Sequence, residues 1–117
     1  MELFDRDEVL DRVGGDGELL AELVVLLAEE CAQLVPAVRE AVGVGDAKTL
    51  EQSAHKLKGS VAQMAAGPAY ATARELERKG REGELAGAVE EAERLEREIL
   101  ELLGALRAFV AAEGGVG

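Results

Sequence analysis

The sequence contains one histidine, His55, and the residues that follow it indicate chemistry at its imidazole ring. Lys58 and Gly59 follow three and four residues later, so all three fall on one face of a helix that contains them. A neutral imidazole keeps a free lone pair on one ring nitrogen, which makes it a nucleophile. A phosphoryl group on that nitrogen stays transferable, and a nearby ammonium offsets its negative charge. The pattern predicts a phosphoryl-carrying histidine with Lys58 as its charge partner.

The apolar periodicity around His55 indicates where its side chain points. Between Asp46, a candidate N-cap, and Gly67, apolar residues recur at helical spacing, which predicts one helix over this range. At about 100° per residue, His55 lies opposite the apolar stripe and is expected to face solvent. The stripe consists of Leu50, Ala54, Leu57, Val61 and Met64.

Small and polar residues beside the histidine predict a surface on which another protein docks. A glycine at an exposed helical position costs about 1 kcal/mol relative to alanine, and close approach of a partner would explain Gly59. Gln52, Ala62 and Ala66 lie on the same face, and Lys56 is rotated by about 100°. The alternative interpretation is that His55 is an ordinary solvated residue and that Lys58 is an exposed lysine paired with a nearby glutamate.

The rest of the chain reads as further helices around the one that carries the histidine. Caps, glycines and apolar spacing predict helices over about residues 5–13, 16–42, 46–67, 68–80 and 85–110. No segment shows sustained period-two alternation, and the connections are short. We therefore expect an all-α fold, an antiparallel four-helix bundle with a short additional N-terminal helix that covers one end. Residues 1–112 form the domain, and residues 113–117 are expected to be a flexible tail.

Composition limits the classes of partner. The 117 residues are 48% hydrophobic but only 3% aromatic, so one core of Leu, Val and Ala is expected. The net charge of −11 argues against nucleic acid or an anionic membrane as a partner. The N-terminus lacks the pattern of a secretory signal, and no apolar run is long enough to span a bilayer. Cys31, the single cysteine, allows no intrachain disulfide, so we expect a cytoplasmic setting. Because each long helix has a single apolar stripe, we expect a monomer.

Motifs for enzymatic chemistry are missing from the sequence. It has no phosphate-binding glycine loop, no dinucleotide fingerprint and no HExxH pair. One histidine and one cysteine do not make a zinc site, and the acidic residues follow helical spacing rather than a calcium-loop pattern. We therefore expect no catalysis, no metal and no cofactor of the chain's own.

The stretch Ala54–Ser60 resembles the signature of histidine-containing phosphotransfer (HPt) domains: His, any residue, Leu or Ile, Lys, Gly, then a small residue. The resemblance implies a helical bundle that carries phosphate without ATP chemistry of its own. In it, His55 is the phosphate acceptor, Lys58 assists, and Gly59 leaves room for the partner. The implied partners are receiver domains of response regulators, which contribute the phosphorylated Asp and the Mg²⁺, or a sensor histidine kinase.

Two departures from the family pattern leave questions open. Many members continue with Asn-Leu-Gly-Ala where this chain has Gln63–Ala66, so its helix end is expected to differ. Some members place a Gln or a basic residue on the next helix near the histidine, where spacing suggests Glu77 here. A carboxylate there either orients the imidazole or repels its phosphate. Two alternative functions also remain: a helical adaptor that transfers no phosphate, and the phospho-accepting domain of a chemotaxis-type kinase.

Overall fold

The computed structural model describes residues 2–113, and every regular element in that range is a helix. The all-α prediction is confirmed. The domain is elongated, with principal extents of 47 × 22 × 19 Å. Its helices are α1 (Arg6–Arg12), α2 (Gly17–Val44), α3 (Ala47–Ala62), α4 (Gly67–Glu82) and α5 (Ala88–Glu113).

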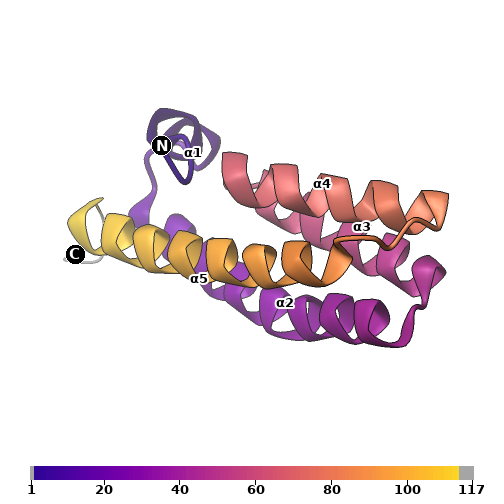
Figure 1. The fold of residues 1–117 in the computed structure, drawn as a ribbon. Coiled ribbons are helices and arrows are strands. Elements are labelled where there is room, and N and C mark those ends of the chain that lie inside the picture. Colours follow the sequence, from indigo (N-terminus) through magenta and orange to yellow (C-terminus); the bar gives the residue numbers. More distant parts are fainter. Residues whose placement is uncertain (1, 114–117) are drawn as a thin grey trace.

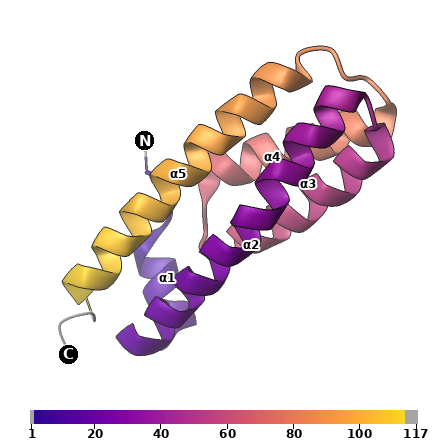
Figure 2. The same ribbon diagram turned by 90° about the horizontal axis from the view of Figure 1, so that it is seen from below.

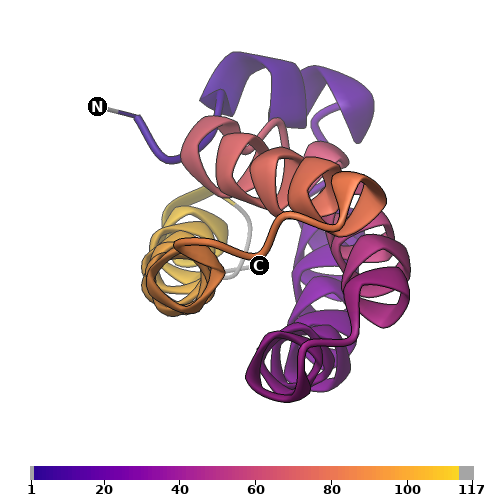
Figure 3. The same cartoon turned by 45° about the vertical axis from the view of Figure 1, so that its right-hand side comes forward.

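The four longer helices form the predicted antiparallel bundle. In Figure 1 and Figure 2 they run side by side, joined by short loops. Figure 3 shows the bundle more nearly along its axis, and in this view α3 and α5 occupy opposite corners of the bundle. Accordingly α2 packs against α3 and α5, and α4 packs against the same two helices. The short α1 lies across one end, as expected, next to the start of α4 in Figure 1.

One aliphatic core runs through the bundle, in accordance with the low aromatic content. The predicted stripe of α3 faces this core, because Leu50, Ala54, Leu57 and Val61 are each 0% exposed. The prediction that His55, on the opposite face of α3, points towards solvent is therefore confirmed. The largest fully buried side chains are Val9, Leu20, Val38, Leu50, Leu57, Val61, Leu76, Leu95, Leu102 and Leu106.

The start of α3 is fixed by its cap, and this sets the register of every residue that follows. The Asp46 carboxylate accepts hydrogen bonds from the Thr49 amide at 3.0 Å and from the Thr49 hydroxyl at 2.7 Å. These bonds from Thr49 lower the pKa of Asp46, although burial acts in the opposite direction. An N-cap that stays ionised at neutral pH is also stabilised by the helix dipole.

The end of α3 differs from the prediction. The helix stops at Ala62 instead of continuing towards Gly67, and Ala65 adopts the left-handed conformation with φ +50°. The Ala66 amide donates to the Val61 carbonyl at 3.4 Å, the six-residue bond of a Schellman turn. The chain therefore leaves the face of α3 before Ala66, which is only 2% exposed. The prediction that Ala66 extends the docking surface is wrong.

The short α1 is fastened to this helix end. The Arg12 guanidinium donates to the carbonyl oxygens of Ala62 and Gln63, at 2.8 Å each. These are carbonyls at the C-terminal end of α3, which lack partners within the helix and are stabilised by a cation. Nearby, the rings of Phe4 and Phe109 lie 5.4 Å apart between centroids, which joins the same end to α5.

Replacing Ala65 by glycine is expected to stabilise the protein. A left-handed alanine costs about 1–2 kcal/mol, whereas glycine adopts this conformation freely. Because glycine loses more backbone entropy on folding, we expect a net gain of about 1 kcal/mol, or about 4 °C in the unfolding temperature. Thermal unfolding followed by circular dichroism measures this. The control is Ala71→Gly at an exposed position inside α4, which should lose about 1 kcal/mol; equal losses from both changes would contradict the prediction.

Two predicted boundaries shift slightly at the C-terminal side. The fourth helix continues past Gly80 to Glu82 and ends at a left-handed Gly83. Glu113, which was assigned to a tail, is the last residue of α5, and the rest of that predicted tail lies outside the described residues. Within residues 2–113, no helix combines the length and the apolar character needed to cross a membrane.

Candidate functional site

His55 stands on the outer face of α3 and is held there by a carboxylate from α4. Its side chain is 66% exposed, and Nδ1 lies 2.7 Å from Oε2 of Glu77. The other carboxylate oxygen of Glu77 lies 2.7 Å from Nζ of Lys58. Glu77 itself is only 12% exposed. His55 and Lys58, which were predicted to act together, are thus joined through Glu77 of the neighbouring α4.

The carboxylate determines which ring nitrogen is available. An ionised carboxylate only accepts hydrogen bonds, so Nδ1 must carry the proton that it donates to Glu77. In the neutral imidazole this leaves the lone pair on Nε2, on a side chain that is largely exposed. The exposed nitrogen is therefore the nucleophilic one.

The pKa of Glu77 shows that its charge persists at neutral pH. Burial raises the pKa, but hydrogen bonds from Lys58 and His55 lower it further than burial raises it. The net pKa lies below the ordinary value for a glutamate, so the carboxylate stays ionised well into the acidic range. Of the two roles that the sequence left open for Glu77, the observed contact is that of an orienting group.

Two grooves flank the histidine, one on each side of α3. The groove towards α2 has a volume of about 490 Å³, and it is lined by Lys56 and Gly59 of α3 and by Leu34 of α2, among others. The groove towards α4 has a volume of about 570 Å³ and contains both Lys58 and Glu77. Of the predicted docking residues, Lys56 lines the first of these grooves, whereas Gln52 and Ala62 line neither.

The remaining predicted residues keep their expected places on α3. Gln52 and Lys56 are exposed, and Ala62 is half-buried. Gly59 is exposed, and a methyl group added to it would meet nothing within 4 Å, so no contact inside the domain requires a glycine there. The hydroxyl of Ser60 donates to the carbonyl of Lys56 at 3.1 Å, in line with the structural role expected for it.

Gly80 has a role in the site that the sequence analysis did not predict. A Cβ atom on Gly80 would lie 2.5 Å from the backbone nitrogen of Glu51 and 2.7 Å from the carbonyl oxygen of Ala47. Helices α3 and α4 therefore touch backbone to backbone, one helical turn from Glu77. A glycine inside a helical pattern is a signal of such an approach, but the pattern does not say which helix is approached.

Other parts of the described chain offer no comparable site. Within residues 2–113, no group of three or more His, Cys, Asp or Glu side chains is placed to hold a metal ion. Burial raises the pKa of the Cys31 thiol to about 11, which keeps it protonated and unreactive at neutral pH. A groove between α4 and α5 contains none of the predicted site residues.

The comparison with protein families decides the class of this chain. A family model described as "Hpt domain" matches residues 22–109, which is more than half of the 117 residues. The chain belongs to the Hpt domain family. The matched range includes α3, α4 and the His55 site, whereas α1 lies outside it. Searches among curated proteins and among solved structures gave no match.

Membership gives the site a chemical context. Hpt domains take part in phosphotransfer within two-component signalling, as phosphocarriers rather than as catalysts. The arrangement in this Hpt domain suits such a carrier, since the imidazole is exposed, a half-buried carboxylate holds its inner nitrogen, and a lysine balances the charge of that carboxylate. The resemblance of the histidine motif and the family match thus agree.

Replacing Glu77 by glutamine is expected to slow phosphoryl uptake by about tenfold or more. The amide is neutral and does not stabilise positive charge on the ring, and its NH₂ group can hold the wrong tautomer. The rate of label transfer from a phosphorylated receiver domain measures the effect. Glu101→Gln is the matched control, because Glu101 is an exposed glutamate of α5 that lines neither groove beside His55. An unchanged rate for Glu77→Gln would show that the contact has no part in transfer.

Proposed function

We propose that His55 of this Hpt domain accepts a phosphoryl group from the aspartate of one receiver domain and donates it to the aspartate of another. The observation that carries the proposal is the exposed imidazole whose Nδ1 is held by Glu77, because it leaves Nε2 both nucleophilic and accessible. This is the chain's single histidine, and it lies within the matched residues 22–109.

The transfer step balances with the groups at hand. The Nε2 lone pair attacks phosphorus, the P–N bond forms, and the P–O bond to the receiver's aspartate breaks, so that the carboxylate leaves with the bonding electrons. The ring keeps its Nδ1 proton and becomes positively charged, which the Glu77 carboxylate stabilises at 2.7 Å. In the reverse step, a receiver's carboxylate attacks phosphorus and the P–N electrons return to Nε2, which restores the neutral ring.

The supporting residues have separate parts in the proposal. Lys58 neutralises Glu77 in the resting domain, and its flexible side chain can offset the charge of the phosphoryl group after transfer. Gly59 leaves space for the partner's backbone beside the histidine. The receiver supplies Mg²⁺ and the reacting aspartate, so the carrier itself needs no metal. The proposed setting is the cytoplasm.

The experiment that tests the proposal is a transfer assay. Each receiver domain encoded in the same genome is phosphorylated with labelled phosphate and incubated with this Hpt domain and Mg²⁺. We expect a label on the Hpt domain that is lost in acid and kept in alkali, as for phosphate on a histidine nitrogen. If no receiver, and no sensor kinase, labels the domain, the phosphotransfer proposal is wrong.

The adaptor alternative makes a different prediction for the same assay. An adaptor binds its partner without taking up phosphate, so it would bind a receiver and remain unlabelled. The chemotaxis-type alternative predicts labelling by an ATP-dependent kinase domain and no labelling by receivers. The contact between His55 and Glu77 favours transfer over the adaptor, because binding alone does not need a defined tautomer.

A further inference from the structure

The charges of this domain are unevenly distributed among its helices. Helices α3 and α4 together carry seven Lys and Arg against four Asp and Glu, which gives a net charge of +3. The rest of the chain carries six basic against twenty acidic residues, within a total of 13 and 24. The two helices that carry His55 and Glu77 are thus cationic in a protein whose net charge is −11.

Two arginines of α4 concentrate this charge beside the site. Arg74 and Arg81 lie three residues before and four residues after Glu77, so they share its side of the helix. Both are exposed, and both line the groove that contains Lys58 and Glu77. Within residues 2–113 neither forms an ion pair, whereas Arg78 beside them pairs with Glu75 and Glu82.

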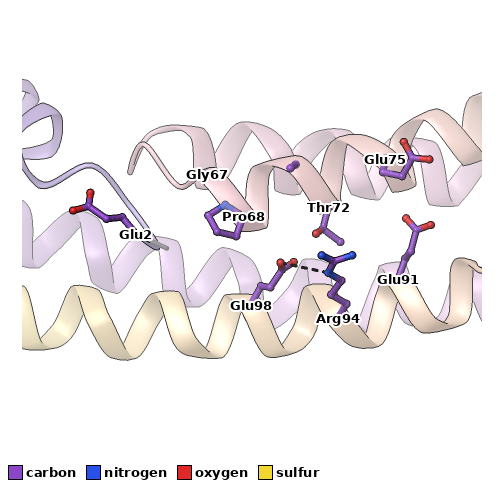
Figure 4. A pocket seen from close by; sticks show the side chains of 9 residues that line it. Glu2, Gly67, Pro68, Thr72, Glu75, Glu91, Arg94 and Glu98 are labelled. Atoms are coloured by element: carbon purple, nitrogen blue, oxygen red, sulfur yellow. Dashed lines mark ion pairs between the residues drawn. The ribbon is translucent and has the colours of Figure 1, made fainter.

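The other side of α4 has the opposite character. The groove between α4 and α5 is lined by Glu2, Glu91 and Glu98, together with Glu75, which also lines the groove beside Lys58, and Figure 4 shows Arg94 paired with Glu98. The two exposed arginines of α4 without an ion pair therefore line the groove that also contains Lys58 of α3. Exposed charges act over about 8–10 Å at physiological salt, so the two sides are distinct to an approaching partner.

We infer that Arg74 and Arg81, together with Lys58, form a contact strip for an acidic surface next to the phosphorylated aspartate of the receiver domain. The inference rests on the proposed function. Two observations favour this partner: Arg74 and Arg81, which form no ion pair within residues 2–113, complement an acidic surface, and the groove that they line also contains Lys58 and Glu77 of the His55 site. Such charges raise the rate of association and fix the orientation of the partner more than they raise affinity.

The test compares two double variants that change the net charge equally. Arg74→Gln with Arg81→Gln removes the strip, and Arg97→Gln with Arg107→Gln removes two exposed arginines of α5, a helix that does not pack against α3. Association with an unphosphorylated receiver domain is followed by stopped flow at low and high salt. We expect the strip variant to associate about tenfold more slowly at low salt, the control less than twofold, and the difference to shrink at high salt.

The outcomes separate the strip from the phosphotransfer itself. Equal slowing in both double variants would mean that only net charge matters, and no slowing in either would mean that the arginines make no contact; each result overturns the inference. Binding of a short DNA duplex that depends on Arg74 and Arg81, with receiver association unchanged, overturns the class of partner. If wild-type protein associates through the strip but takes up no label, the inference stands and the proposed function fails.

Discussion

The substitution His55→Gln is expected to abolish phosphoryl uptake completely while the domain stays folded. Glutamine has no nucleophilic nitrogen, and no other histidine is present to replace His55. Since the side chain is 66% exposed, we expect the free energy of unfolding to change by less than about 0.5 kcal/mol. Label transfer from a phosphorylated receiver measures the first effect, and urea unfolding measures the second.

The control for this variant is its binding to the same receiver domain. Glutamine is polar and similar in size to the imidazole, so the docking surface should survive and the affinity should change little. Persistent label on His55→Gln would place the accepted phosphate on another residue. Unimpaired signalling by this variant in cells would support the adaptor alternative.

Gly80→Ala is expected to cause the largest loss of stability, about 3 kcal/mol. The added methyl carbon would lie 2.5–2.8 Å from backbone atoms of α3, and a helix backbone cannot move aside as a side chain can. Helix α4 must shift outwards, which also separates Glu77 from His55 and slows phosphoryl uptake. Urea unfolding and the transfer assay measure the two consequences. A variant as stable as the wild type would show that the helices are not in close contact there.

Gly59→Ala is the matched control, because it is the same change in an open environment. A methyl group there meets nothing within 4 Å, and alanine favours the helix by about 1 kcal/mol, so stability should rise. Phosphoryl uptake should nevertheless fall, since the added carbon lies where the partner is proposed to approach. Together the two variants distinguish a glycine that the fold requires from one that only a partner requires.

The bundle and the orientation of His55 could be predicted because they depend on local patterns. Capping residues such as Asp46 set where a helix begins, and apolar spacing sets which face is buried, so an exposed His55 followed from short-range sequence alone. The role of Glu77 could not be decided in this way. It depends on the distance between two helices, which is set by Gly80 against α3 and not by the spacing along either helix.

The predicted end of α3 was wrong for a related reason. Apolar periodicity continues through Met64, and alanine is the residue that most favours a helix, so Ala62, Ala65 and Ala66 gave no sign of a stop. Tertiary contacts decide the end instead, because Arg12 from the distant α1 binds the carbonyls exposed there. With the helix shortened, Ala66 turns inwards and the predicted docking surface loses its last residue.

The hydrogen bonds of Arg12 also show that the folded domain needs residues outside the range that matches the family. The family match begins at residue 22, yet the carbonyls at the end of the phosphate-carrying helix are satisfied from residue 12. A fragment cut at the family boundary would leave those carbonyls to water and uncover Phe109, whose ring packs against Phe4. In this protein the matched segment is thus smaller than the segment whose contacts fix the end of α3.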